Sequence, residues 1–354
     1  MNRALLSVGV VLSTCVLCPA QNRPEPTKAA APAVVDTSPL IHEADIDAPV
    51  AKVWDVFSTD EGFKMLGVAH AKIDFRNGGK MLSHYDPKGT LGDEGTIENT
   101  ILTFEPQRMI AWHITKPPKG FPFMTAFKTT WTVATFSDLG NGKSHLRMAG
   151  LGYTADEESQ KMRAFFQQGN AYVLDILKKK LTGTTEAPAQ KTAAAAEDPL
   201  SPFTLETTVN AMPADVWKSW TTSEGFKAFM GVENKIELRI GGPFEIYFSM
   251  TPPAGSRGSE GCTILSYEPE RMLSFSWNAP PKFAHARAEH TWVVLTIAPH
   301  GAHGSKVTLK HFGFAEQVAA HPDQAEEWKE VRGYFRKAWP NVLKALTEHY
   351  QPKQ

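Results

Sequence analysis

Two histidines occupy strand-like positions that point toward apolar neighbours. His311 shares one face of its run with Val307 and Leu309, because alternate residues of a strand face the same side. His42 lies on the apolar side of a shorter run near the N-terminal end of the chain. An inward imidazole could anchor a polar group of a ligand, or act as an acid or base near neutral pH. The alternatives are a core histidine that hydrogen-bonds to the backbone and, for His42, a frayed strand end.

Apolar and aromatic residues alternate along the strands that should accompany these histidines. Such a lining suits a hydrophobic small molecule or lipid, whereas the alternative is a core in which the same side chains fill all the space. The small residues Gly169 and Ala338, on two expected long helices, favour a void. The predicted ligand-binding residues are His42, Tyr85, Ile110, Trp112, Ile114, Phe248, Leu273, Phe275, Trp277 and His311.

Several common catalytic and cofactor motifs are missing from the sequence. It contains no Gly-x-x-x-x-Gly-Lys-Ser/Thr phosphate loop, no Gly-x-Ser-x-Gly serine-hydrolase motif and no His-Glu-x-x-His zinc motif. Beyond the first 20 residues the one cysteine is Cys262, so we expect a buried thiol and no zinc site built on several thiolates. No carboxylate pairs with His42 or His311 in sequence. We therefore expect no metal, no cofactor and no catalytic residue.

The composition fits a packed globular protein of two domains. Of the 354 residues, 42% are hydrophobic and 21% are charged, and two domains of about 100–150 residues fit this length. The 37 basic side chains nearly balance the 38 acidic ones, which gives a formal net charge of −1. A near-neutral chain lacks the basic surplus that is typical of nucleic-acid binding. We therefore expect no nucleic-acid partner.

The segment 1–20 has the pattern of a cleaved export signal. Arg3 precedes an apolar run that is shorter than the roughly 20 residues of a spanning helix, and the small residue Ala20 follows it. The alternatives are a membrane anchor and a lipoprotein acylated at Cys15 or Cys18, although neither cysteine follows the usual Gly or Ala. We expect an exported protein, periplasmic or secreted, with no membrane span after signal cleavage.

The rest of the chain contains one pattern twice. Val53-Trp54 recurs as Val216-Trp217, 163 positions later, and the same register still matches Pro117-Pro118-Lys119 with Pro280-Pro281-Lys282. Such a register predicts an internal duplication. The shift falls to 161 where Thr130-Trp131 matches Thr291-Trp292, and becomes 169 where Leu177 matches Leu346. Stretches rich in Pro, Ala and Thr separate the copies. The expected segments are a flexible spacer over 21–39, a first domain over 40–181, an Ala/Pro-rich linker over 182–202 and a second domain over 203–350.

Each copy has the same order of expected elements: a strand, short helices, five or six further strands and a long helix. The strands should extend over about 72–152 and 235–313. An antiparallel sheet must bury one face, and the long helix is the one element large enough to cover it. The apolar faces expected of the long helices are Met162, Phe165, Phe166, Val173, Leu174, Leu177 and Leu181 in the first copy, and Trp328, Val331, Phe335, Ala338, Val342 and Leu346 in the second.

The sequence resembles the activator of 90-kDa heat-shock-protein ATPase homologue-like family, within the START/birch-pollen-allergen (SRPBCC) superfamily. The resemblance rests on Ala-Pro-x-x-x-Val-Trp at 48–54, on the Arg-x-Gly-Gly turns at 76–79 and 239–242, and on Glu-Pro-x-Arg-Met at 105–109 and 268–272. It covers nearly all of both copies. It implies two tandem α+β helix-grip domains, each a curved seven-stranded antiparallel sheet wrapped around a long C-terminal helix, with a cavity between them.

Three classes of function remain. The first is a non-enzymatic binding protein that holds a hydrophobic small molecule or lipid in one or both cavities. The second is stimulation of a chaperone ATPase by surface contact, which export disfavours because that chaperone is cytosolic. The third is an enzyme that uses His42 or His311. The copies differ at these places, since His42 corresponds to Leu205 and Gly150 corresponds to His311.

Overall fold

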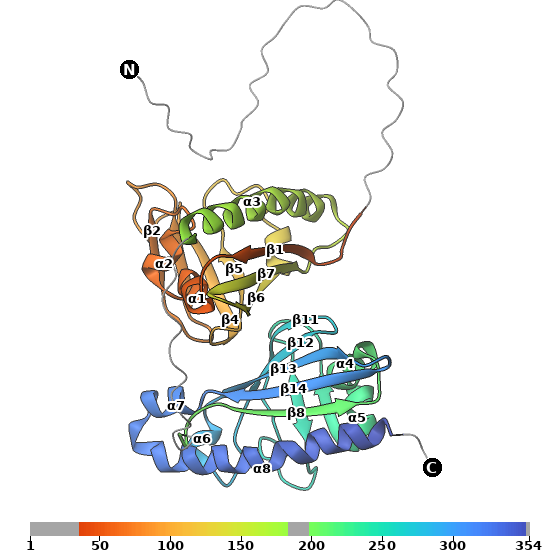
Figure 1. The fold of residues 1–354 in the computed structure, drawn as a ribbon. Helices are drawn as coiled ribbons and strands as arrows, with labels where there is room; N and C mark the ends of the chain where they lie inside the picture. The colour runs from red at the N-terminus through yellow and green to blue at the C-terminus, as the bar shows by residue number, and fades with distance from the viewer. Residues whose placement is uncertain (1–34, 183–197, 352–354) are drawn as a thin grey trace, which may run out of the picture. The chain divides into compact units, whose positions relative to one another are not determined.

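The computed structural model describes residues 35–182 and 198–351. The expected signal 1–20, most of the spacer 21–39 and the centre of the linker 182–202 lie outside these residues. The structure shows two tandem α+β helix-grip domains, each ending in a long helix (Figure 1). No helix in the described part of the chain is long and apolar enough to cross a membrane.

The first domain has one antiparallel sheet of seven strands in the order β1-β7-β6-β5-β4-β3-β2. The first strand therefore pairs with the last, as in the predicted arrangement, and six strands follow the short helices. Asn141 and Gly142, with φ of 54° and 71°, form the tight turn between the last two strands, a backbone region that Asn and Gly adopt most readily. The strands are β1 Leu40–Ile46, β2 His70–Ile73, β3 Lys80–His84, β4 Ile97–Glu105, β5 Met109–Lys116, β6 Trp131–Gly140 and β7 Lys143–Leu151.

The helices of the first domain lie on one side of this sheet (Figure 1). The long helix α3 begins after Asp156, whose side chain accepts a hydrogen bond from the Ser159 N–H, and acidic residues fill its first turn. Of its expected apolar face, Met162, Leu174, Leu177 and Leu181 are buried. The expectation was wrong for Phe165, which is 51% exposed. The helices are α1 Val50–Ser58, α2 Asp60–Lys64, the short 3₁₀ helix η1 Ala126–Thr129 and α3 Glu157–Leu181.

The second domain divides the corresponding strands into two sheets, of five and two strands. In the first domain Lys80 of β3 pairs with Thr100 of β4. The equivalent pair of the second domain, Pro243 and Thr263, forms an isolated bridge, because proline has no N–H with which to continue a ladder. The strands are β8 Phe203–Val209, β9 Glu233–Ile236, β10 Phe244–Tyr247, β11 Ile264–Glu268, β12 Met272–Trp277, β13 Thr291–His300 and β14 Gly304–Phe312.

The helix α8 covers the sheet of the second domain with large aromatic side chains. Trp328, Val331, Phe335, Val342 and Leu346 of its expected face are buried, and so is Trp339. The helices of this domain are α4 Pro213–Thr221, α5 Ser223–Met230, α6 Ala284–Arg287, α7 Phe314–Ala320, the 3₁₀ helix η2 Pro322–Gln324 and α8 Ala325–His349.

Strand register confirms that both histidines lie on the inner faces of their sheets. Along β1 buried and exposed residues alternate, and His42 is on the buried side, 7% exposed and opposite Met148 of β7. His311 lies opposite Phe203 of β8 and is fully buried. The two domains therefore each place one histidine on the first or last strand, as the duplication predicts.

Candidate functional site

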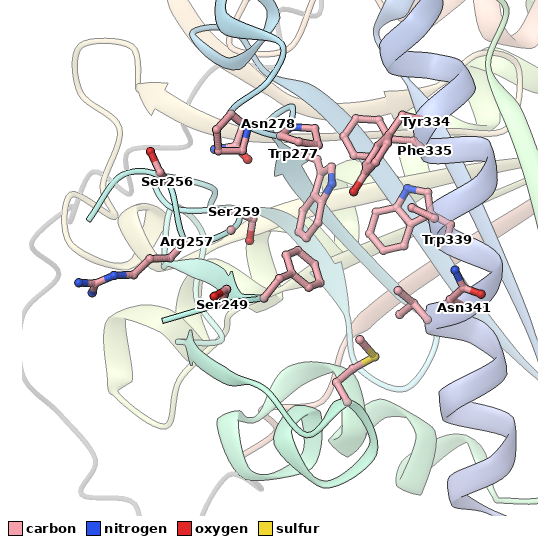
Figure 2. Close-up of a pocket in the computed structure, with 17 residues that line it drawn as sticks. Ser249, Ser256, Arg257, Ser259, Trp277, Asn278, Tyr334, Phe335, Trp339 and Asn341 are labelled. Atoms are coloured by element: carbon pink, nitrogen blue, oxygen red, sulfur yellow. The ribbon is translucent and has the colours of Figure 1, made fainter. Parts of the chain in front are cut away.

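A pocket of about 450 Å³ opens in the second domain (Figure 2). Its walls come from the middle of α8, the ends of β10 and β12, and the loop 248–259. Most of the lining is apolar and aromatic, which is typical of sites for small organic molecules. The lining residues are Met230, Phe248, Ser249, Ser256, Arg257, Gly258, Ser259, Trp277, Asn278, Pro280, Pro281, Tyr334, Phe335, Ala338, Trp339, Asn341 and Val342.

Two tryptophans from different elements form the centre of the pocket wall. Trp277 ends β12 and Trp339 lies on α8, and their ring centroids are 5.0 Å apart with planes at 43°. The ring of Phe248 meets Trp277 edge-on at 6.4 Å. Figure 2 shows the rings of Trp277 and Trp339 next to each other, one from the strand and one from the helix. Rigid aromatic faces in this arrangement can hold a flat or elongated apolar molecule at a small conformational cost.

Polar groups line one side of the pocket, and two of them hydrogen-bond to the backbone of the protein. Ser259 Oγ accepts from the Ile246 N–H at 2.8 Å, and Asn278 Nδ2 donates to the Glu260 carbonyl at 2.8 Å. Figure 2 shows the Arg257 guanidinium directed away from the aromatic rings. Ser259 and Asn278 therefore support the shape of the wall.

Arg287 fastens the loop that forms this polar side. Its guanidinium donates to the carbonyls of Ala279 at 2.5 Å, Gly255 at 2.6 Å and Gly258 at 3.0 Å. The carboxylate of Glu260 lies 3.6 Å away and accepts from the backbone N–H groups of the loop. The planar fork of arginine suits several carbonyl acceptors at once. The loop is thus tied to the end of β12 and to α6.

His311 connects both tryptophans from behind the wall. The Trp339 Nε1–H donates to His311 Nδ1 at 3.0 Å, so the proton of the neutral ring is on Nε2. Nε2 then donates to Thr291 Oγ1 at 2.8 Å, and Thr291 Oγ1 donates to the Trp277 carbonyl at 2.9 Å. Complete burial lowers the pKa of His311 to about 3, so the ring is neutral near pH 7. Both ring nitrogens are engaged within the protein.

The other predicted residues of the second domain divide into two groups. Phe248 and Trp277 line the pocket. Leu273 and Phe275 are fully buried in the core, with the Phe275 ring 5.6 Å from that of Trp277. These two residues support the wall from inside the sheet.

The predicted residues of the first domain do not come together around one space in the same way. His42 Nε2 donates to the Gln167 carbonyl of α3 at 3.0 Å, and its buried Nδ1 has no hydrogen-bond partner among the residues that the structure describes. Tyr85, one residue beyond β3, is 61% exposed. Ile110 is fully buried, whereas Trp112 and Ile114 are half-buried at the edges of two apolar clusters.

The residues equivalent to the pocket wall are smaller or polar in the first domain. Ile114 stands at the place of Trp277, and Asn170 at the place of Trp339. Gly150 replaces His311, and a Cβ there would lie 3.3 Å from the ring of Tyr153. Tyr153 therefore occupies part of the space that the imidazole takes in the second domain.

Sequence reasoning missed Trp339 and the loop 249–259. Trp339 follows Ala338 on the expected apolar face of α8, so its place in the helical period could have identified it. The loop has no periodicity, and its serines and glycines indicate only a turn-rich connection. Its position on the pocket depends on Arg287, which lies far from it in sequence.

One histidine–carboxylate pair in the first domain has a structural role. His84 Nε2 donates to Asp93 Oδ1 at 2.9 Å, and His84 Nδ1 accepts from the Asp86 N–H at 3.0 Å. Hydrogen bonds from the Thr90 and Gly95 N–H groups, together with His84, hold the pKa of Asp93 at about 2. Both ring nitrogens are used to fix the loop between β3 and β4, which leaves neither for a proton transfer.

The described residues give no further reactive centre. Within residues 35–182 and 198–351, no group of three or more His, Cys, Asp or Glu side chains could hold a metal ion. Cys262 is buried, as predicted, and burial raises the pKa of its thiol to about 12. Such a thiol is a poor nucleophile.

Comparisons with solved structures show remote similarity to this fold. The di-domain ARO/CYC BexL from the BE-7585A biosynthetic pathway has 11% identity over 89% of this chain and 99% of its own, with a TM-score of 0.33. CalU16 from Micromonospora echinospora has 20% identity over 41% and 75%, with a TM-score of 0.30. The Aha1 dimer from Colwellia psychrerythraea has 13% identity over 40% and 96%, also with a TM-score of 0.30. No curated protein matches the chain.

The family comparison identifies the chain at the level of its domains. The model of the family described as "Activator of Hsp90 ATPase homolog 1-like protein" matches residues 47–182 and again residues 210–351. Each match extends from the start of the first short helices to the end of the long C-terminal helix. The chain belongs to the Hsp90 ATPase activator homologue 1-like family and carries its domain twice.

Proposed function

We propose that the second domain binds a hydrophobic small molecule or lipid with an aromatic or elongated apolar body, and does so without catalysis. The observation that carries the proposal is the pocket of about 450 Å³ whose wall includes Trp277 and Trp339. Pockets of about 300–1,000 Å³ with mostly apolar walls are typical of sites for small organic ligands. The first domain serves as a companion domain without an equivalent aromatic wall.

The chemistry of the pocket favours binding over reaction. His311 is neutral, and both of its nitrogens are hydrogen-bonded within the protein. The Cys262 thiol is held in its protonated form by burial. The polar groups of the lining are serine, asparagine, the Tyr334 hydroxyl and an arginine that is directed outward. None of these groups is placed as an activated nucleophile or as a general base.

We also propose that the protein acts outside the cytoplasm. The proposal rests on the sequence pattern of residues 1–20, a basic residue followed by a short apolar run and a small residue. A periplasmic or secreted carrier would hold a sparingly soluble molecule in such a pocket without needing a nucleotide. Fractionation of cells that express the full chain tests this part, since an intact N-terminus in the cytoplasm would contradict it.

The binding proposal is tested with the neutral fluorescent probe N-phenyl-naphthylamine, added to the purified protein. Phe248 is 51% exposed and lines the pocket, so Phe248→Ala removes wall area with little effect on folding. We expect the Kd of the probe to rise by about three- to tenfold, because an aromatic contact of about 1 kcal/mol is lost. Trp339→Ala should raise the Kd by at least about tenfold.

The matched control is Tyr85→Ala, since Tyr85 is the equivalent of Phe248 in the first domain and is 61% exposed. This variant should bind the probe as the unmodified protein does. Loss of probe binding in Tyr85→Ala, with Phe248→Ala unaffected, would transfer the site to the first domain. A protein that binds neither the probe nor a co-purifying apolar compound, as judged by native mass spectrometry, would contradict the proposal.

A further inference from the structure

We propose that His311 keeps the pocket of the second domain open, by holding the Trp339 indole in its place in the wall. The inference rests on the proposed binding function and deepens it. It makes His311 a positioning residue, because both of its nitrogens are bonded to protein groups and none is left for a bound molecule.

The indole needs an acceptor in the place where it lies. Trp339 is 3% exposed, and its Nε1–H donates to His311 Nδ1 at 3.0 Å. A buried donor that loses its acceptor costs about 1–3 kcal/mol. Without the imidazole, the indole could recover a hydrogen bond by turning its N–H toward the pocket. The ring would then occupy part of the space that a ligand needs.

The surroundings of His311 keep it in the form that can accept this hydrogen bond. The rings of Phe314 and Phe335 lie 4.8 Å from the imidazole, and that of Phe203 lies 5.5 Å away. These apolar neighbours disfavour a charged ring. The second nitrogen is fixed by Thr291, whose hydroxyl also bonds to the Trp277 carbonyl. One neutral side chain therefore bonds to the Trp339 indole directly and, through Thr291, to the backbone of Trp277.

The first domain lacks each of the side-chain contacts that connect His311 with Trp339 and Trp277. Glycine stands at the place of His311, asparagine at the place of Trp339 and isoleucine at the place of Trp277, namely Gly150, Asn170 and Ile114. Thr130, the equivalent of Thr291, donates instead to the Phe127 carbonyl at 3.2 Å. The histidine, its hydroxyl partner and the two tryptophans occur together in the domain that contains the described pocket.

The test compares His311→Leu with His311→Gln in the full chain. Leucine fills the space but accepts no hydrogen bond, whereas the glutamine amide can both accept from Trp339 and donate to Thr291. We expect His311→Leu to raise the Kd of N-phenyl-naphthylamine by about tenfold or more, and His311→Gln by less than about threefold. In a ¹H–¹⁵N spectrum the Trp339 indole resonance, assigned with Trp339→Phe, should shift and exchange with solvent faster in the leucine variant alone.

A second variant keeps the test decisive if leucine prevents folding. Thr291→Val preserves shape and removes the hydroxyl that joins His311 to Trp277, so we expect the probe Kd to rise by about three- to tenfold. If either His311→Leu or Thr291→Val is folded and leaves both the probe Kd and the Trp339 resonance unchanged, the inference is wrong. If the unmodified protein binds no probe, the binding function fails, while the indole resonance still reports whether His311 holds Trp339.

Discussion

The two domains share one fold, yet their long helices meet their sheets in different ways. In the middle of α8 the side chains of Arg332, Phe335, Trp339 and Val342 are buried. The corresponding stretch of α3, residues 163–173, buries no side chain; its burial is confined to both ends of the helix. The same helical register therefore supports a wall of aromatic rings in one domain and a loosely packed helix in the other.

This difference shows that the fold does not depend on the residues that form the pocket. Both helices are anchored at their ends, α3 by Met162 and Leu177 and α8 by the equivalent Val331 and Leu346. Positions between the anchors are free to vary, because the ends already fix the helix on the sheet. The second domain has used that freedom to place Trp339 and Phe335 beside a pocket.

The largest expected effect comes from replacing a buried residue near the start of α8 with the residue at the equivalent position of α3. Trp328 is 1% exposed, and its equivalent in the first domain is Ser159. Trp328→Ser removes a large buried side chain, and we expect a loss of about 3–5 kcal/mol in the free energy of unfolding. Urea unfolding of the full chain, followed by circular dichroism, measures it.

The control for this exchange is Ser159→Ala in the first domain. It removes the hydroxyl that accepts from the Thr154 N–H at 2.9 Å, and we expect a loss of only about 1 kcal/mol. Equal losses in the two variants would show that the two helices are anchored to the same extent, and would remove the contrast between the domains.

The second prediction concerns acid. Burial lowers the pKa of His311 from 6.5 to about 3, so between these values the unfolded chain binds a proton that the folded chain excludes. The stability that His311 contributes is therefore complete above about pH 6.5 and is lost as the pH falls toward 3, by up to about 1.4 kcal/mol per unit. His311 contacts Thr291, Trp339 and three phenylalanines, none of which is charged.

Unfolding of the unmodified protein and of His311→Gln at about pH 7 and pH 4.5 isolates this contribution. Glutamine does not titrate, so the variant should lose less stability on acidification, by about 2 kcal/mol. The first domain has Gly150 at this place, which does not titrate, so a substitution there should leave the pH dependence of stability unchanged. A variant with the same acid sensitivity as the unmodified protein would show that His311 takes up its proton in the folded state.

The sequence predicted the fold because its signals are local and repeated. The duplication is visible as motifs that recur 163 residues apart, and each apolar helix face is set by residues that are close in sequence. The structure places six strands and a long helix after each pair of short helices, as expected. The division of the second sheet was missed, although Pro243 at the place of Lys80 could have indicated it.

The site was less predictable because it depends on contacts between distant segments. The alternation of residues along the strands predicted inward positions for Phe248, Trp277 and His311. Phe248 and Trp277 line the pocket, and His311 lies on the inner face of its sheet. Tyr85 and Phe248 each lie one residue beyond their strand and are more than half exposed, and of the two Phe248 lines the described pocket. The role of His311 depends on Trp339 and Thr291, which come from α8 and β13, and no spacing in the sequence connects them.

The smallest expected effect comes from replacing an exposed residue of α3 with the residue at the equivalent position of α8. Tyr172 on α3 is 56% exposed, and its equivalent on α8 is Asn341 at the edge of the pocket. Tyr172→Asn gives the first domain the second domain's residue, and we expect a change of less than about 0.5 kcal/mol in the free energy of unfolding, because an exposed side chain buries little area. Urea unfolding measures it, with Leu177→Ala, a fully buried neighbour on the same helix, as the contrasting variant at about 2–5 kcal/mol. A large loss in Tyr172→Asn would mean that the middle of α3 is covered in solution, and that the open helix of the first domain is itself a binding surface.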